Sequence, residues 1–208
     1  MLGRLHDRPR APARRDCCEV FADGHLSHRG PLSNYKVQRA RKDDPGDHGI
    51  GRSRGGLTTK THAIVDGRGL PLVLIVTPGQ AGDSPALTLL LGELRVARQG
   101  PGRPRTTPDA LRGDKAYSSR ATRALLRSRG ITAVIPEPKD QIGHRARRGS
   151  RGGRPVSFDI EDYKHRNVVE RTFNQVKQRR GLATRYDKYA ITYRGSMVLA
   201  AIVLWLRA

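Results

Sequence analysis

The sequence has few cysteines and lacks both a signal peptide and a long apolar run. Its cysteines, Cys17 and Cys18, are adjacent, and no Cys-x-x-Cys pair occurs. Adjacent cysteines cannot form an ordinary structural bridge with each other, so neither a disulfide framework nor a zinc knuckle is indicated. The N-terminus has no apolar core of the signal-peptide kind, and the most apolar stretch, residues 197–206, has about half the length of a bilayer crossing. We therefore expect a soluble protein of the reducing cytoplasm that does not contact a membrane.

Acidic residues are also scarce. The chain has 19 Asp and Glu against 40 Lys and Arg, which gives a net charge of +21. A charge of this size attracts polyanions, so nucleic acid is the expected partner rather than general solvation alone. The length of 208 residues allows one main domain, and the hydrophobic fraction of 36% with 23 Gly and 13 Pro leaves a large share to loops and basic extensions.

The order of elements predicts an α/β fold. We expect residues 1–16 to form a disordered basic N-terminal arm and residues 25–56 to form a long loop. The expected strands and helices are a short strand over 17–22, a β-hairpin over 57–77, a helix over 86–99 capped by Asp83, a strand ending at Asp114, a helix over 121–129 capped by Ser118 or Ser119, a strand over 131–136 and an apolar helix over 194–207 that packs on the sheet.

This order is that of the RNase H-like mixed sheet flanked by helices, in which the fourth strand lies beside and parallel to the first. We expect two parts: residues 1–50 as a poorly ordered basic segment that holds the remnant first strand, and residues 51–208 as the catalytic domain. In such a sheet Asp114 lies at the edge where ligands bind in open α/β folds. Asp66 precedes a hairpin turn at the opposite end of the sheet, so we interpret it as a turn residue.

A helix predicted over residues 163–177 carries a polar stripe. Tyr163, Arg166, Glu170 and Lys177 fall within about 60° of one another around the helix. An apolar stripe lies beside them, formed by Val169, Phe173 and Val176. A solvated ladder of charges would give the same spacing. The alternative is a helix that packs by one face and presents a carboxylate, framed by Arg and Tyr, to metal and phosphate.

Glu170 and Asp114 together suggest hard divalent metal ions held by oxygen, with substrate phosphates completing the coordination. Two-metal chemistry of this kind calls for a third acid. Asp23, after the first apolar run, is one candidate. Asp83 is a weaker one because we expect it to cap a helix.

A basic insert separates the last predicted strand from the polar helix. It lies between Pro136 and Phe158 and contains six basic residues among glycines: Lys139, Arg145, Arg147, Arg148, Arg151 and Arg154. Such a segment cannot form a core, so we expect a mobile loop that lies along a phosphate backbone, with a solvated loop as the alternative.

The residues quoted so far resemble a known family. Tyr163, Arg166, Glu170 and Lys177 match the Y-(2)-R-(3)-E-(6)-K signature of bacterial insertion-sequence DDE transposases at all four positions. The flanking sequence is similar too, over GRSRGGLTTKTH at 51–62, DGRGLPL at 66–72, TPGQAGD at 77–83, GDKAYSS at 113–119, RGSRGGRP at 148–155 and RNVVERTFNQVKQRRGLATRYDK at 166–188. The resemblance spans roughly residues 38–208, and its motifs are too long for coincidence.

The resemblance implies a DNA transposase that cleaves and transfers strands at insertion-sequence ends, using two Mg²⁺ ions for which Mn²⁺ can substitute. Its partners would be double-stranded DNA of the element ends and the target, with a homodimer during transposition, and it would act on the nucleoid in the cytoplasm. Asp114 would match the family's second Asp and Glu170 its Glu, both as catalytic metal ligands. Tyr163, Arg166 and Lys177 match positions that contact DNA phosphates near the cut, for which a forked guanidinium is well suited.

The chain departs from the family at its front. Members have a helical DNA-binding region and then a strand that ends in an Asp-Ser-Thr or Asp-Gly-Thr motif. Here about 50 residues precede the GRSRGG motif, and Asp23 stands about 28 residues before Gly51, near the place of the first catalytic Asp. The alternative is an N-terminally truncated or frame-shifted copy whose first strand has been replaced by unrelated sequence.

Three functions are consistent with the sequence. The first is an active transposase with Asp23, Asp114 and Glu170 as catalytic residues. The second is a catalytically inactive transposase remnant that only binds DNA. A basic RNA-binding protein would account for the charge but not for the spacing of the signature.

Overall fold

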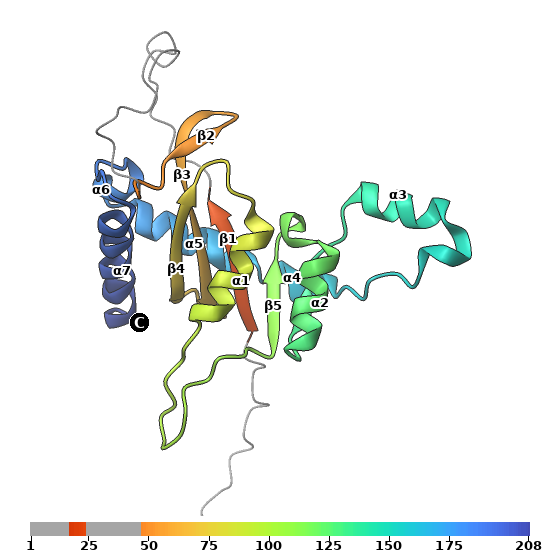
Figure 1. Ribbon diagram of the computed structural model, residues 1–208. Coiled ribbons are helices and arrows are strands. Elements are labelled where there is room, and N and C mark those ends of the chain that lie inside the picture. The colour runs from red at the N-terminus through yellow and green to blue at the C-terminus, as the bar shows by residue number, and fades with distance from the viewer. Residues whose placement is uncertain (1–16, 24–46) are drawn as a thin grey trace, which may run out of the picture.

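The computed structural model describes residues 17–23 and 47–208. Residues 1–16, the predicted basic arm, lie outside this part, and so do residue 24 and residues 25–46 of the predicted long loop. Six strands of the described chain form one sheet (Figure 1): β1 Cys17–Asp23, β2 Gly51–Ser53, β3 Gly56–Asp66, β4 Pro71–Pro78, β5 Ala110–Gly113 and β6 Thr132–Val134.

The sheet is mixed. β3 pairs antiparallel with β4 and with β1, and the small strand β2 also pairs with β3. β1 pairs parallel with β5, which pairs parallel with β6. The structure confirms the strand predicted over 17–22 and the hairpin predicted over 57–77. It also confirms the parallel pairing of the first and fourth main strands.

Residues 51–53 were predicted as loop, and that prediction was wrong. They form β2 because the hydroxyl of Ser53 donates a hydrogen bond to the carbonyl of Gly56 over 3.1 Å. This contact closes a tight turn and lets the chain fold back onto the start of β3.

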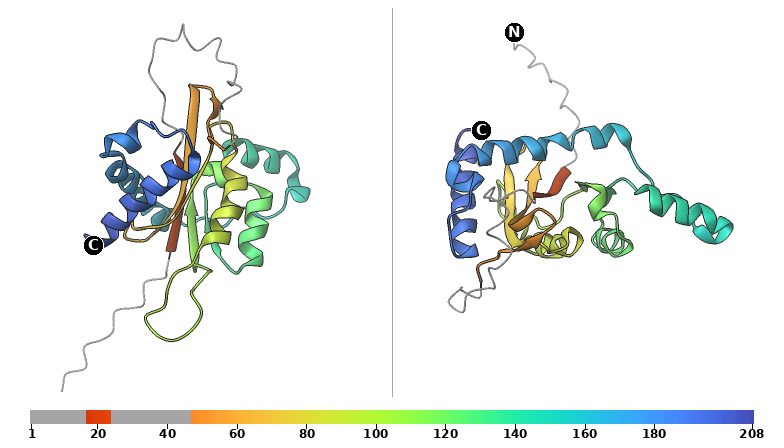
Figure 2. Two further views of the ribbon diagram at one scale, coloured as in Figure 1. Left: turned by 60° about the vertical axis from the view of Figure 1, so that its left-hand side comes forward. Right: turned by 90° about the horizontal axis from the view of Figure 1, so that it is seen from above.

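Helices cover both faces of the sheet (Figure 2), with α1 and α2 on one side and α5 and α7 on the other. Within residues 17–23 and 47–208, no helix has the length and apolar character needed to cross a membrane. The helices are α1 Asp83–Glu93, α2 Arg120–Ser128, α3 Lys139–Arg147, α4 Ile160–Lys164, α5 Asn167–Lys177, α6 Arg180–Ala183 and α7 Ala190–Leu206, with short 3₁₀ turns η2 Lys115–Tyr117 and η3 Gly149–Gly152.

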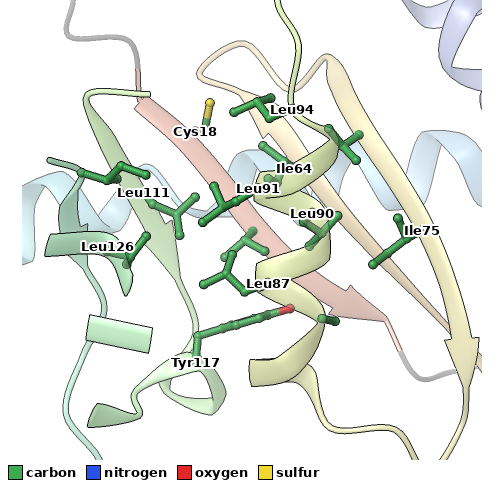
Figure 3. Close-up of a cluster of buried hydrophobic side chains, with 14 of the residues drawn as sticks. Cys18, Ile64, Ile75, Leu87, Leu90, Leu91, Leu94, Leu111, Tyr117 and Leu126 are labelled. Atoms are coloured by element: carbon green, nitrogen blue, oxygen red, sulfur yellow. The ribbon is translucent and has the colours of Figure 1, made fainter. Parts of the chain in front are cut away.

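The alternation of side chains along β3 divides the core into two layers. Ile64 points to the α1 side, where Leu87 and Leu90 are fully buried against it (Figure 3). Ala63 and Val65 belong to the opposite layer, which includes residues of α5 and α7. Because neighbouring residues of a strand point to opposite faces, one strand supports both layers. The predicted packing of the last apolar helix on the sheet is confirmed.

Predictions about three short polar features had different outcomes. Ser119 caps α2, because its hydroxyl accepts a hydrogen bond from the Thr122 N–H over 3.0 Å. Asp66 is a turn residue, with its carboxylate accepting from the N–H groups of Arg68 and Leu70 over 2.9 and 2.8 Å.

The prediction that Asp83 caps α1 was wrong. Gly82 occupies the cap position and Asp83 is the first helical residue. The carboxylate of Asp83 instead pairs with the Lys60 ammonium of β3 over 2.9 Å. The lysine charge draws the carboxylate toward the sheet, away from the helix N–H groups.

A buried arginine, Arg185, fixes the connection between α6 and α7 to the start of the sheet. Its guanidinium donates to the carbonyls of His48, Asp187 and Lys188 and to the hydroxyl of Thr59. Only 6% of Arg185 is exposed, and its charged group lies over the ring of Tyr193 at 5.1 Å. Burial lowers the pKa of Arg185 from its usual value. One side chain thus joins the segment after α6 to the start of the sheet, more than 120 residues away in the sequence.

We expect Arg185→Met to lower the free energy of unfolding by about 3 kcal/mol, because several buried carbonyls lose their donor together. Urea unfolding followed by circular dichroism measures this change. Arg180→Met removes an exposed arginine of α6 and should change the stability by less than about 0.5 kcal/mol. Equal effects of the two substitutions would contradict a structural role of Arg185.

Candidate active site

The backbone brings Asp23 and Asp114 to the same edge of the sheet. Asp23 is the last residue of β1, and Asp114 directly follows Gly113, the last residue of β5. The two strands are parallel, with Val20 opposite Gly113. Parallel strands end at one edge, so Asp23, three residues after Val20, and Asp114, one residue after Gly113, lie at the same edge, with Asp23 two residues further along its strand. The side chain of Asp23 is outside the described part of the chain.

The contacts of α5 direct Glu170 toward this edge. Val169, Phe173 and Val176 are buried against the sheet. Thr172 donates a hydrogen bond to the carbonyl of Gly69 in the β3–β4 turn over 2.6 Å. That turn lies at the opposite end of the sheet, because Asp66 pairs with Cys18 near the start of β1.

Glu170 is about 160° away from Thr172 around the helix, on the side opposite the β3–β4 turn. With its apolar face on the sheet and Thr172 on the hairpin turn, α5 directs Glu170 away from that turn, which is toward the end of the sheet where β1 and β5 end. Glu170 is exposed there.

Tyr163 lies within the electrostatic influence of both acids. Burial raises the pKa of its hydroxyl, Arg166 lowers that pKa, and the negative charges of Asp114 and Glu170 raise it further. The guanidinium of Arg166 lies over the Tyr163 ring at 5.4 Å and donates to the Glu170 carboxylate over 3.2 Å. The structure therefore gathers four predicted site residues: Asp114, Tyr163, Arg166 and Glu170.

The helix predicted over 163–177 is divided, which corrects the sequence interpretation. α4 ends at Lys164 and α5 begins at Asn167, and Figure 2 shows them following one another. The Arg166 N–H donates to the Tyr163 carbonyl over 3.0 Å and the Val169 N–H to the Arg166 carbonyl over 3.2 Å. These bonds span three residues rather than four, so the junction is a tighter turn than an α-helix. Tyr163 and Arg166 nevertheless remain in contact.

Lys177 is the last residue of α5 and lies on the same side of it as Glu170. Seven residues correspond to a rise of about 10 Å along the axis. Lys177 is therefore displaced from the acidic residues toward the α6 end of the helix.

Asp83 also lies near the edge that holds Asp114. Burial raises the pKa of Tyr117, and the negative charges of Asp83 and Asp114 raise it further. Asp83 begins α1, however, which covers the face of the sheet opposite to α5, and its charge is balanced by Lys60. Asp66 is at the far end of the sheet and takes no part in the cluster.

The basic insert is not the mobile loop that we predicted. Residues 139–147 form α3, and residues 149–152 form the 3₁₀ turn η3, which together project from the body as an arm (Figure 1). No residue of either element is buried, in agreement with the expected lack of a core. Contacts at its base hold α3 to the body, because Gln141 donates to the Ser118 carbonyl over 2.7 Å and Arg145 pairs with Glu137.

Two of the predicted DNA-binding arginines in this arm already have partners. Arg145 pairs with Glu137 at the base of α3, and Arg147 contacts the His144 ring nitrogen over 2.8 Å. Arg147, Arg148, Arg151 and Arg154 are exposed, and so is Lys139. The arm thus presents most of its positive charge to solvent.

Sequence analysis missed a partly buried ion pair beside the site. Arg112 of β5 donates to the carboxylate of Asp162 on α4, with the Nε–Oδ1 distance at 3.2 Å. Only 8% of the Arg112 side chain is exposed. An arginine inside the short apolar strand before Asp114 was the one signal that could have indicated it.

The acids of the site have the right chemistry for a hard divalent cation, because carboxylate oxygens are the ligands that such ions prefer. Asp114 and Glu170 supply two carboxylates near Tyr163. Among the side chains that the structure describes, no group of three or more His, Cys, Asp or Glu residues could hold a metal ion. A third acidic ligand of the metal would have to be a residue whose side chain the structure does not describe.

Comparison with known proteins identifies the class. The family described as Transposase DDE domain matches residues 21–206, nearly the whole chain. The chain therefore belongs to the DDE transposases of insertion sequences.

A curated relative is also named for an insertion sequence element. The chain is similar to a protein named as a candidate transposase for insertion sequence element IS6501 of Brucella ovis, with 34% identity over 151 residues. The alignment covers 73% of this chain and all of that relative.

The charges around Tyr163 give a direct test of the site geometry. We expect Glu170→Gln and Asp114→Asn each to lower the pKa of Tyr163, because each removes a neighbouring negative charge, and Arg166→Ala to raise it. NMR titration of ¹³C-labelled tyrosine measures these shifts. Glu161→Gln, an exposed change on α4, is the control and should leave the Tyr163 pKa unchanged. If the Tyr163 pKa is the same in wild type, Glu170→Gln and Asp114→Asn, these residues do not cluster as the structure shows.

Proposed function

We propose that this transposase cleaves and transfers DNA strands at the ends of its insertion sequence, with Mg²⁺ as the metal cofactor and Mn²⁺ as a substitute. The observation that carries the proposal is the convergence of Asp114 and Glu170 on Tyr163 at the edge where parallel strands end. The order β4-β3-β1-β5-β6 supports assignment of the sheet to the RNase H-like fold.

In this proposal Asp114 and Glu170 are catalytic residues that hold the metal through carboxylate oxygens. Asp23 is proposed as the third ligand, because its backbone lies on the strand next to that of Asp114. When bound, the metal ions would lower the pKa of an attacking water or 3′-hydroxyl and neutralise the charge of the leaving oxygen.

The positive residues around the acids would orient the DNA. Arg166 offers a planar, permanently charged donor to a phosphate, and its position over Tyr163 limits the directions in which it can point. Lys177 would bind a second phosphate further along the same side of α5. Charge neutralisation by these residues would bring the phosphate diester close to the carboxylates without mutual repulsion.

The expected partner is double-stranded DNA of the element ends and of the target. The exposed arginines of α3 and η3 would bind the phosphate backbone at a distance from the cut. We further propose a homodimer during transposition and action on the nucleoid in the cytoplasm.

A second function is an inactive transposase that only binds DNA. The observation that favours it is that Asp23 is followed by Gly-His, which does not match the Asp-Ser-Thr or Asp-Gly-Thr motif of the family. Binding would then rest on the arm, Arg166 and Lys177, and no strand would be cut.

A nicking assay separates these functions. With DNA that carries the element ends and Mg²⁺ or Mn²⁺, we expect cleavage that falls at least about 10³-fold in Glu170→Gln and in Asp114→Asn, because each loses a metal ligand. Glu161→Gln should cleave at the wild-type rate. Asp23→Asn with unchanged cleavage would exclude Asp23 as the third ligand, and binding without cleavage in the wild type would establish the DNA-binding function instead.

The salt dependence of DNA binding tests the arm. Replacing Arg147, Arg148 and Arg151 by Gln should reduce the slope of log K against log salt by about 2 to 3, because each lost phosphate contact retains one counterion. The matched control replaces three exposed arginines elsewhere, Arg98, Arg103 and Arg127, and removes the same charge. If both variants change the slope equally, the arm makes no specific contact with DNA.

A further inference from the structure

The partly buried ion pair between Arg112 and Asp162 joins the strand before one proposed catalytic acid to the helix before the other. Arg112 lies in β5 and Asp162 in α4, and Nε and Nη2 of the arginine both donate to Oδ1 of the carboxylate. The arginine side chain is 8% exposed and the aspartate side chain 28%. The two residues are 50 positions apart in the sequence, so the pair fixes a tertiary contact.

On the strand side the pair is close to Asp114. Arg112 and Asp114 are two residues apart at the end of β5, and Asp114 retains an extended backbone. Residues two apart in extended chain point to the same face. The guanidinium therefore lies on the face that Asp114 shares with α4.

On the helix side the pair is connected to Glu170 through a short series of contacts. Asp162 precedes Tyr163, whose ring packs on Phe158 at 5.2 Å and against Ala110 and Val134 of the sheet. Arg166 lies over Tyr163 and pairs with Glu170. The position of α4 on β5 thus influences where Tyr163, Arg166 and Glu170 lie relative to Asp114.

Apolar packing alone would hold α4 to the sheet but would not fix the orientation of the helix on it. The contacts of Phe158 and Tyr163 with Ala110 and Val134 are non-directional. Two hydrogen bonds from one guanidinium to one carboxylate oxygen allow only a narrow range of relative positions of the two side chains. An ion pair with one buried partner contributes little to stability compared with apolar residues of similar volume, so we attribute to this pair a role in orienting α4.

We propose that Arg112 and Asp162 are positioning residues, which set the separation between Asp114 and the Tyr163–Arg166–Glu170 group and so determine metal affinity and cleavage rate. This inference rests on the proposed function for its effect on cleavage. Its effect on metal binding can be measured without any cleavage.

The decisive variant replaces both partners by apolar residues, Arg112→Met with Asp162→Leu, so that no unpaired charge remains buried. We expect it to fold with a melting temperature within a few degrees of wild type, to cleave at least tenfold more slowly and to bind DNA in EDTA within threefold of wild type. Asp162→Asn and Arg112→Lys should change cleavage in the same direction.

Terbium titration gives the readout that does not depend on activity. Tb³⁺ bound at the carboxylates accepts excitation from Tyr163, and loss of this signal in Tyr163→Phe identifies it. We expect the Tb³⁺ concentration for half-saturation to rise at least fivefold in the apolar double variant and in Asp162→Asn. Glu93→Gln, which removes the partner of Arg194 in an ion pair elsewhere, is the control and should leave the titration unchanged.

The outcomes separate the two claims. A folded double variant with wild-type Tb³⁺ affinity and cleavage would show that the pair contributes only to stability and would overturn the inference. If the double variant does not fold, the Tb³⁺ titrations of Asp162→Asn and Arg112→Lys decide in the same way. Absence of cleavage by the wild type would overturn the proposed function, while the Tb³⁺ titration would still test the positioning role.

Discussion

The candidate site depends on the parallel pairing of β1 with β5. Because the strands run in the same direction with Val20 opposite Gly113, Asp23 and Asp114 meet at one edge although about 90 residues of chain separate them. A shift of the pairing by one residue would move every side chain of β5 to the other face. Arg112 and Asp114 would then point toward α1 and lose their relation to Asp162 and Glu170.

α5 completes the site because its three sides have different functions. One side is buried on the sheet through Val169, Phe173 and Val176, and a second is bonded to the β3–β4 turn through Thr172. These contacts determine the rotation of the helix, so Glu170 on the third side is oriented without being buried itself. An exposed carboxylate can be both oriented and open to substrate only if other residues of its helix provide the anchoring.

The sequence predicted the features that short-range patterns encode. The alternating run of β3, the apolar run of β4 and the Ser119 cap each depend on residues a few positions apart, and all are present in the structure. The features that it did not predict depend on distant partners or on the absence of a buried face. The choice of Asp83 between capping α1 and pairing with Lys60 is decided by a residue 23 positions away, and Arg112 finds Asp162 across 50 positions. α3 buries nothing and so gives no hydrophobic periodicity, and the tight turn before α5 has no Gly or Pro to mark it.

The arm of α3 and η3 begins and ends at neighbouring points on the body. The chain leaves from β6, which ends at Val134, and returns at Phe158, and both residues contribute to one small apolar cluster with Tyr163 and Ala110. Because the base is closed, the intervening segment can change in length or charge without separating Asp114 from Glu170. Under the proposed function, the contacts of the arm with DNA could therefore evolve separately from the cleavage chemistry.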